Sequence, residues 1–164
     1  MCYLPDGKHL LAVGIEPGHG VRDYLIDVGT GESKPVTTEG VSGVVLSDDG
    51  RQVVVTGPDS QTGIWTFGGS ALRPIPGFDP MNVVSGWTPD GKSLYVTSRQ
   101  VVQTAKVYRL DVATGKLEFW KEFGIGLPAN ATRVGVPRFS ADSTAYAYSY
   151  DQVLCQAYVV KGFK

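Results

Sequence analysis

Apolar and polar residues alternate with a period of two along most of this chain, and turn residues separate the alternating stretches. The clearest examples are KHLLAVG from Lys8, RQVVVTG from Arg51 and KSLYVTS from Lys92. Such alternation places successive side chains on opposite faces of a strand. No window carries the helical i, i+3, i+4, i+7 pattern for three turns, and 21 glycines and 10 prolines interrupt the chain. The pattern predicts an almost entirely antiparallel β protein.

Each of these strands follows a tight turn built on an aspartate. The turn aspartates are Asp6, Asp49, Asp90 and Asp142, at intervals of 43, 41 and 52 residues. An aspartate side chain accepts hydrogen bonds from nearby backbone N–H groups, and a following glycine tolerates positive φ, so both favour a hairpin. The fourth copy, FSADSTAYAYSY, departs from the others because Ser143 replaces the glycine.

A second hairpin follows each of the first three. The segments are RDYLIDVGTGESKPVT, GIWTFGGSALRPIP and AKVYRLDVATGKLEFWKE, each with a glycine-containing turn between two strands. The repeating unit is therefore strand A, Asp-Gly turn, strand B, a longer loop, strand C, a Gly turn and strand D. Two of the three intervals match the ~40–45 residues of a four-stranded propeller blade. The sequence predicts an all-β partial β-propeller of about four blades, each a four-stranded antiparallel sheet.

The first and last blades are expected to be incomplete within a single domain over 1–164. We place the blades at about 1–40, 41–80, 81–127 and 133–164. Blade one has only Cys2-Tyr3-Leu4 for strand A, and blade four is expected to run VPRFS, YAYSY and QAYVV without a strand D. An unfinished arc of repeats leaves a sheet face bare at each end, which we expect to be apolar. We therefore expect self-association, either as a homodimer completing an eight-bladed ring or as an open-ended assembly.

The composition of the chain argues against nucleic acids and membranes as partners. The formal net charge of −1 provides no bulk attraction to nucleic acid or to an anionic membrane. No apolar run approaches the roughly 20 residues that span a bilayer, and MCYLPDGK has no leader-like pattern. We expect no nucleic acid partner and no membrane insertion. Cys2 and Cys155 are far apart in the chain and outside any CxxC motif, so two free thiols are expected.

No catalytic or metal-binding motif is recognisable. Val21-Arg22-Asp23 lacks the histidine and the asparagine of a kinase catalytic loop, and G-x-S-x-G is absent. Asp48-Asp49 belongs to a hairpin turn, and no D-x-D-x-D-G loop exists. We predict a protein that is not an enzyme and needs no cofactor or metal. Trp65, Trp87 and Trp120, and Tyr146, Tyr148 and Tyr150, are expected to pack between sheets.

The repeat resembles a known family. It begins with an apolar or aromatic residue, Ser or Thr, Pro-Asp-Gly-Lys and an apolar strand, and a later strand ends in Asp-x-x-Thr-Gly. In these features the repeat resembles that of the TolB-like β-propeller family. More narrowly, GVSGVVLSDDGRQVVVTGPD, LRPIPGFDP, VYRLDVATGKLEFWKEFG and the terminal YAYSYDQVLCQAYVVKGFK are similar to the C-terminal propeller region of certain bacterial serine/threonine protein kinases, over essentially the whole chain. The resemblance implies the last half of a sensory or scaffolding propeller. A cytoplasmic location is favoured, and an extracytoplasmic one is expected if the parent is a membrane-anchored kinase.

The longer loops point to a recognition surface. In this repeat the B–C and D–A connections share one side of the sheets, opposite the short turns, and they include the long segment Gly124 to Val136. The predicted ligand-contacting residues on this side are His19, Arg22, Arg99, Arg133 and Asp151. His9 follows a turn and is expected to be solvated. The favoured function is non-catalytic recognition of a protein or small ligand. The alternatives are an accessory substrate-gating propeller of a prolyl-oligopeptidase-type hydrolase and a gene fragment without present function.

Overall fold

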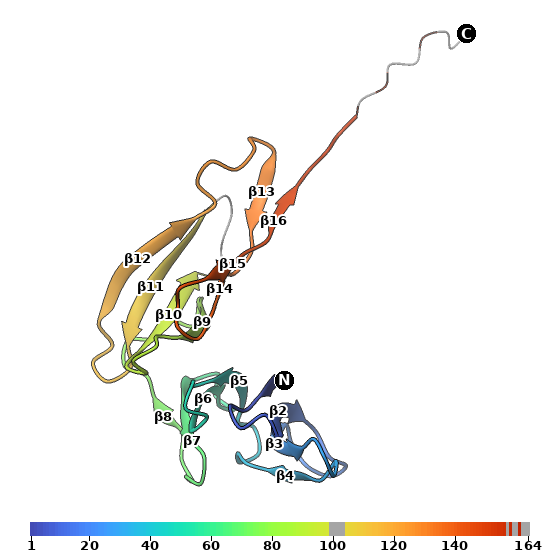
Figure 1. The fold of residues 1–164 in the computed structure, drawn as a ribbon, viewed down its shortest axis with the longest axis vertical. Coiled ribbons are helices and arrows are strands. Elements are labelled where there is room, and N and C mark those ends of the chain that lie inside the picture. Colours follow the sequence, from blue (N-terminus) through green and yellow to red (C-terminus); the bar gives the residue numbers. More distant parts are fainter. Residues whose placement is uncertain (99–103, 157, 159–160, 162–164) are drawn as a thin grey trace.

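The structure, a computed structural model, describes residues 1–98, 104–156, 158 and 161 (Figure 1). Over these residues every regular element is a β-strand, and the strands form three four-stranded sheets and two two-stranded ones. All strand pairs are antiparallel. The predicted all-β class and partial propeller are confirmed.

Blades one to three are the four-stranded sheets, and in each the strand order follows the chain. The two-residue strand β1 confirms that strand A of blade one is a stub. Blade one contains β1 (Cys2–Tyr3), β2 (His9–Gly14), β3 (Arg22–Asp27) and β4 (Ser33–Pro35). Blade two contains β5 (Ser42–Leu46), β6 (Gln52–Thr56), β7 (Thr62–Thr66) and β8 (Arg73–Pro74). Blade three contains β9 (Asn82–Trp87), β10 (Ser93–Ser98), β11 (Ala105–Asp111) and β12 (Leu117–Phe123).

Blade four is a single bent hairpin. Its first arm is β13 (Ala131–Val134) with β14 (Arg138–Phe139), and its second arm is β15 (Tyr146–Ala147) with β16 (Tyr150–Gln152). β14 pairs with β15 and β13 with β16, while Gly135 N donates to Ser149 O at 2.8 Å between them. The two arms therefore correspond to strands A and B.

For blade four, one expectation is corrected and another falls mostly outside the described residues. The segment 124–136, predicted as one of the longer loops, contains β13, because residues 131–134 pair with the far end of strand B. A third strand was expected at 156–160, but Gln156 and Tyr158 belong to no strand, and residues 157, 159 and 160 lie outside the described residues. The described residues after β16 lead away from the sheets (Figure 1).

The predicted aspartate turns are confirmed in detail at Asp90. Its Oδ1 accepts hydrogen bonds from Lys92 N at 3.1 Å and from Thr88 Oγ1 at 2.6 Å. Gly91 adopts φ +67°. The fourth turn has the same form, since Asp142 accepts hydrogen bonds from Ser140 and Thr144 and Ser143 takes φ +55°. The Asp side chain thus accepts hydrogen bonds that the N–H groups of the turn would otherwise donate to water.

This geometry predicts the effect of removing one turn. Asp90→Ala combined with Gly91→Ala is expected to lower the free energy of unfolding by about 1–2 kcal/mol, because it removes the side-chain acceptor and places a Cβ at positive φ. Urea denaturation measures this change. Lys92→Ala is the matched control, since only the Lys92 backbone takes part in the turn. An unchanged urea midpoint for the double variant would contradict this account of the turn.

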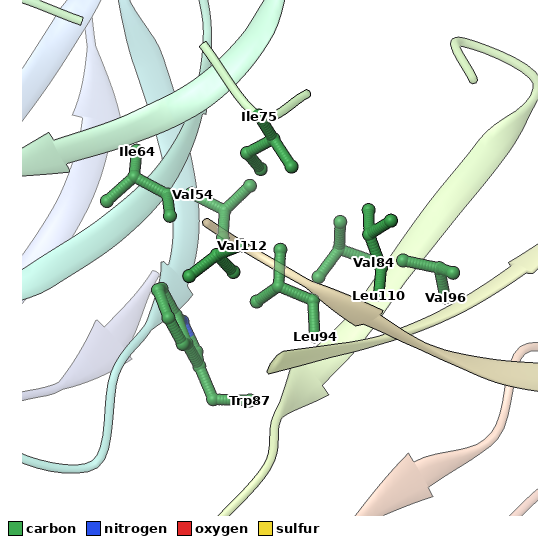
Figure 2. Close-up of a cluster of buried hydrophobic side chains, with 9 residues drawn as sticks. All are labelled: Val54, Ile64, Ile75, Val84, Trp87, Leu94, Val96, Leu110 and Val112. Carbon is green, nitrogen blue, oxygen red and sulfur yellow. The ribbon is translucent and has the colours of Figure 1, made fainter. Parts of the chain in front are cut away.

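The core lies between the blades rather than within any one of them. Three clusters of buried side chains lie between consecutive blades, one at each contact. The first contains Leu11, Val41, Val53, Val55 and Trp65. The second contains Val54, Ile64, Ile75, Val84, Trp87, Leu94, Val96, Leu110 and Val112, contributed by blades two and three (Figure 2). The third contains Tyr95, Ala105, Val107, Phe123 and Val134.

Position along strand B decides which neighbour a side chain meets. Val53 and Val55, four and six residues after the turn aspartate Asp49, pack in the first cluster, toward the preceding blade. Val54, between them, packs in the second cluster, toward the following blade. The equivalent residue Tyr95 of blade three packs in the third cluster. Alternation along a strand therefore assigns one face to each neighbour.

Five of the six aromatic side chains predicted at these interfaces lie there. The prediction is wrong for Tyr150, which is 43% exposed and makes no ring contact with the described part of blade three. Trp65 and Trp87 are buried, and Trp120 is half-buried against the third cluster. The rings of Tyr146 and Tyr148 lie 4.9 and 5.6 Å from that of Phe123, so strand B of blade four packs on blade three. Cys2 and Cys155 are free thiols, as expected.

Candidate functional site

Two loops of blade one form a compact polar group at one end of β3. The B–C loop before β3 is held against the connection to blade two by the hydrogen bond from Gly40 N to Val21 O, 2.7 Å long. Arg22 also forms an isolated bridge with Val41. These backbone contacts place Glu39 beside the B–C loop. We call Glu16, His19, Arg22 and Glu39 the loop cluster.

Side-chain contacts join all members of the loop cluster. His19 Nδ1 lies 2.6 Å from Glu39 Oε1, and Arg22 Nη1 lies 4.0 Å from the same oxygen. Arg22 Nη2 donates to Glu16 Oε2 at 2.8 Å. Arg22 Nε donates to the hydroxyl of Tyr24 at 2.9 Å, and its guanidinium lies 5.4 Å from the centre of that ring. The arginine is therefore held in place, whereas the two carboxylates and the imidazole are about half exposed.

The contacts favour the charged forms of Glu39 and Arg22. The hydrogen bond from His19 lowers the pKa of Glu39, with further help from the backbone N–H of Gly20 and from Arg22. Hydrogen bonds to Tyr24 and Glu16 raise the pKa of Arg22. Because Arg22 already has its partners, the outward-facing groups are carboxylate oxygens and an imidazole. This arrangement suits a ligand that presents hydrogen-bond donors or a positive charge.

The five predicted site residues do not form one site. His19 and Arg22 belong to the loop cluster. Arg133 and Asp151 are Cα partners across β13 and β16, where both are exposed. This pair and the loop cluster lie toward opposite ends of the molecule (Figure 1). Arg99 lies outside the described residues.

Sequence reasoning missed Glu39. It lies 20 residues from His19 along the chain, in the connection between blades one and two. The rule that B–C and D–A connections share one side of the sheet places Glu39 on that side, but it does not specify the contact. His9, in contrast, is at the other end of blade one, where its Nδ1 lies 2.6 Å from Asp6 Oδ2 within the turn.

Two hollows lie elsewhere on the arc. The larger, about 600 Å³, covers the outer part of blade three and is lined by Tyr95, Arg109, Asp111, Lys116 and Glu118 among others. The other, about 440 Å³, is lined by residues of β1, β5, β9 and β14. These are the A strands of all four blades, so the second hollow lies along the inner side of the arc.

Two kinds of side-chain arrangement are absent from the part of the chain that the structure describes. Over that part, no hydrogen bond joins a serine, threonine or cysteine side chain to a histidine. Likewise, within 1–98, 104–156, 158 and 161, three or more His, Cys, Asp or Glu residues nowhere gather as metal ligands. No helix among the described residues is long and apolar enough to cross a membrane.

Solved structures share the fold. TolB from Acinetobacter baumannii matches with 21% identity and a TM-score of 0.59, over 92% of this chain and 39% of TolB. An oligogalacturonate lyase from Vibrio parahaemolyticus matches with 18% identity and a TM-score of 0.60, over 93% of this chain and 45% of the lyase. The chain thus spans less than half the length of either protein. No known family and no curated protein matches its sequence. These likenesses show that the chain has the β-propeller fold that TolB also has.

Proposed function

We propose that this chain is a non-catalytic β-propeller segment that recognises a protein or small ligand through the loop cluster. The supporting observation is that two separate loops place half-exposed carboxylates and an imidazole side by side, with Arg22 fixed beneath them. Loops on a rigid sheet scaffold are common carriers of binding contacts. The similarity of the repeat to kinase-associated propellers suggests a sensor or scaffold role. Self-association of the chain stays a prediction.

A position-specific cross-linking experiment tests this proposal. A photoreactive amino acid replaces His19 in one variant and Thr30 in another. Each variant is irradiated in an extract of the organism whose genome encodes the chain. Thr30 is the matched control because it is exposed and lies in the turn at the other end of β3. We expect a cross-linked partner from position 19 that is absent from position 30.

Two further variants connect the captured partner with the loop cluster. Glu39→Gln is expected to weaken capture several-fold, because it removes the charged partner of His19. Asp6→Asn alters the carboxylate beside His9 and is expected to leave capture unchanged. Equal cross-linking from positions 19 and 30, or none from position 19, would contradict recognition by these loops.

A further inference from the structure

The two ends of the arc carry different surfaces. In blade one, the face directed away from blade two follows from the strand pairing, because Cα partners in neighbouring antiparallel strands share a face. One row is Tyr3, Leu10, Ile26 and Ser33, and the next is Ala12, Tyr24 and Pro35. Tyr3 is 63% exposed. Leu10, Ala12 and Ile26 are only half-buried and belong to none of the three buried clusters. In the second row Tyr24 is 6% exposed, and the Arg22 guanidinium lies 5.4 Å from the centre of its ring. We call these two rows the open face.

The open face uses the positions that contact a preceding blade elsewhere in the chain. Leu10 and Ala12 are four and six residues after Asp6, as Val53 and Val55 are after Asp49. In blade two these positions pack on Leu11 of blade one. In blade three they are Leu94 and Val96, which pack on Val54 and Ile64 of blade two.

The outward face of blade four is of a different kind. Its cross-strand pairs are Arg138 with Ala147 and Arg133 with Asp151, and Ser149 lies between them. All five side chains are exposed. Ala147 is five residues after Asp142, the first strand B position that contacts a following blade elsewhere in the chain, and Ser149 lies two residues further along. The equivalent first position holds Leu11, Val54 and Tyr95 in the other blades. The apolar face expected at both ends is therefore present only on blade one.

Blade three shows the same adaptation beneath the two-stranded blade four. On strand C, the residue paired with Leu11 is Leu25 and the residue paired with Val54 is Ile64, but the residue paired with Tyr95 is Arg109. Arg109 lies over the rings of Tyr95 and Trp120, at 5.9 and 5.4 Å from their centres. A guanidinium covers the aromatic core there, beside the two strands of blade four that the structure describes.

We propose that the arc is extended only at blade one, where the open face binds a further β-blade of the same repeat type, and that blade four is a cap. The occupant is specified by its chemistry: a sheet whose B and C strands present apolar side chains, as Val54 and Ile64 do toward blade three. Terminal repeats with a polar outer face are what stacked-repeat proteins need at an end that stays in solvent. If two copies closed head to tail, the polar face of blade four in one copy would have to pack on the open face of the other, in place of an apolar sheet.

A fusion of the chain with a copy of its own blade two provides the probe. Residues 41–84 placed before Met1 keep the spacing from strand A to the turn aspartate, because Ser85 and Met1 both lie five residues before Asp90 and Asp6. The added Val54 and Ile64 then face Leu10 and Ala12. We expect fluorescence of an apolar dye to fall by at least about half. We also expect the melting temperature to rise by more than about 4 °C.

Point variants keep the proposal testable if the fusion does not fold. In the unfused chain, Leu10→Ser with Ile26→Ser is expected to lower dye binding with little loss of stability, because these side chains are half-buried and belong to none of the three buried clusters. Ala147→Ser with Arg138→Ser, at the other end, is the matched control and is expected to change neither property.

Three results would overturn the proposal. Large destabilisation by the blade-one variants would show that the open face is already covered. Equal loss of dye binding from both ends would show that blade four is not a cap. A stable dimer in sedimentation that is abolished equally by Leu10→Asp and Ala147→Asp would establish head-to-tail closure.

Discussion

Tyr95→Ala is expected to lower the free energy of unfolding by about 3–5 kcal/mol, the range for removing a large buried aromatic side chain. Tyr95 is 1% exposed. Its ring lies 4.5 Å from that of Trp120 and 4.6 Å from that of Phe139. The cavity opens between blades three and four, where a two-stranded hairpin has few other contacts to compensate. We therefore expect the hairpin to lose its packing before the rest of the arc unfolds.

Urea denaturation followed by tryptophan fluorescence measures both effects, since Trp120 lies in the same cluster. Tyr150→Ala is the matched control, because it removes the same side chain from blade four at a position that is 43% exposed. Its effect is expected to stay below about 1 kcal/mol. Equal losses for the two variants would contradict the assignment of Tyr95 as the centre of this interface.

The contribution of Asp23 to stability is expected to be larger at pH 4 than at pH 7. The side chain is 0% exposed between blades one and two, and its two oxygens share the single N–H of Gly43, each at 3.0 Å. Burial raises the pKa of this carboxyl to about 6, although the Gly43 hydrogen bond and the α-amino group oppose the shift. No side-chain cation pairs with Asp23 among the described residues.

The direction of the pH dependence follows from proton binding. Between the unfolded pKa of about 3.9 and the folded value, the native state binds more protons than the unfolded state, so stability falls as pH rises. The raised pKa corresponds to at most about 3 kcal/mol, present in full below the unfolded pKa and lost as pH passes the folded one. Above pH 7 the contribution of Asp23 to the free energy of unfolding is expected to stay constant as pH rises.

Asp23→Asn is expected to remove the slope between pH 4 and 6, measured by urea denaturation at fixed ionic strength. Asp142→Asn provides the contrast. Hydrogen bonds from Ser140 and Thr144 lower the pKa of Asp142 to about 2, so its stabilisation is lost only as pH falls below about 4. Asp142→Asn is therefore expected to change the dependence of stability on pH only below about pH 4, and to lower stability by a constant amount above it. A slope between pH 4 and 6 that persists in Asp23→Asn would show that another group causes it.

Strands and turns of the first three blades were predictable because they depend on local rules. The alternation in RQVVVTG sorts Val53 and Val55 from Val54, and the Asp-Gly pairs specify turns in which Gly91 takes positive φ. Blade four was predicted less well. Its strand A, through β13, pairs with residues up to 21 positions away, and its strand C prediction rested on the pattern of QAYVV alone. The alternation of apolar and polar residues shows which segments are able to form a strand. Whether a segment does so depends on a neighbouring strand with which its backbone can form hydrogen bonds.

The sequence by itself determined the class of fold, the repeat and the face on which each strand residue lies, since these follow from backbone geometry over a few residues. Only the tertiary structure decided which groups meet across blades. Glu39 reaches His19, and Gly43 reaches Asp23, because the connection between blades one and two returns along the start of β3. Arg109 also acquired its role only in three dimensions. Its guanidinium lies over the rings of Tyr95 and Trp120, and it is the pairing of β10, β11 and β12 that brings these three side chains together.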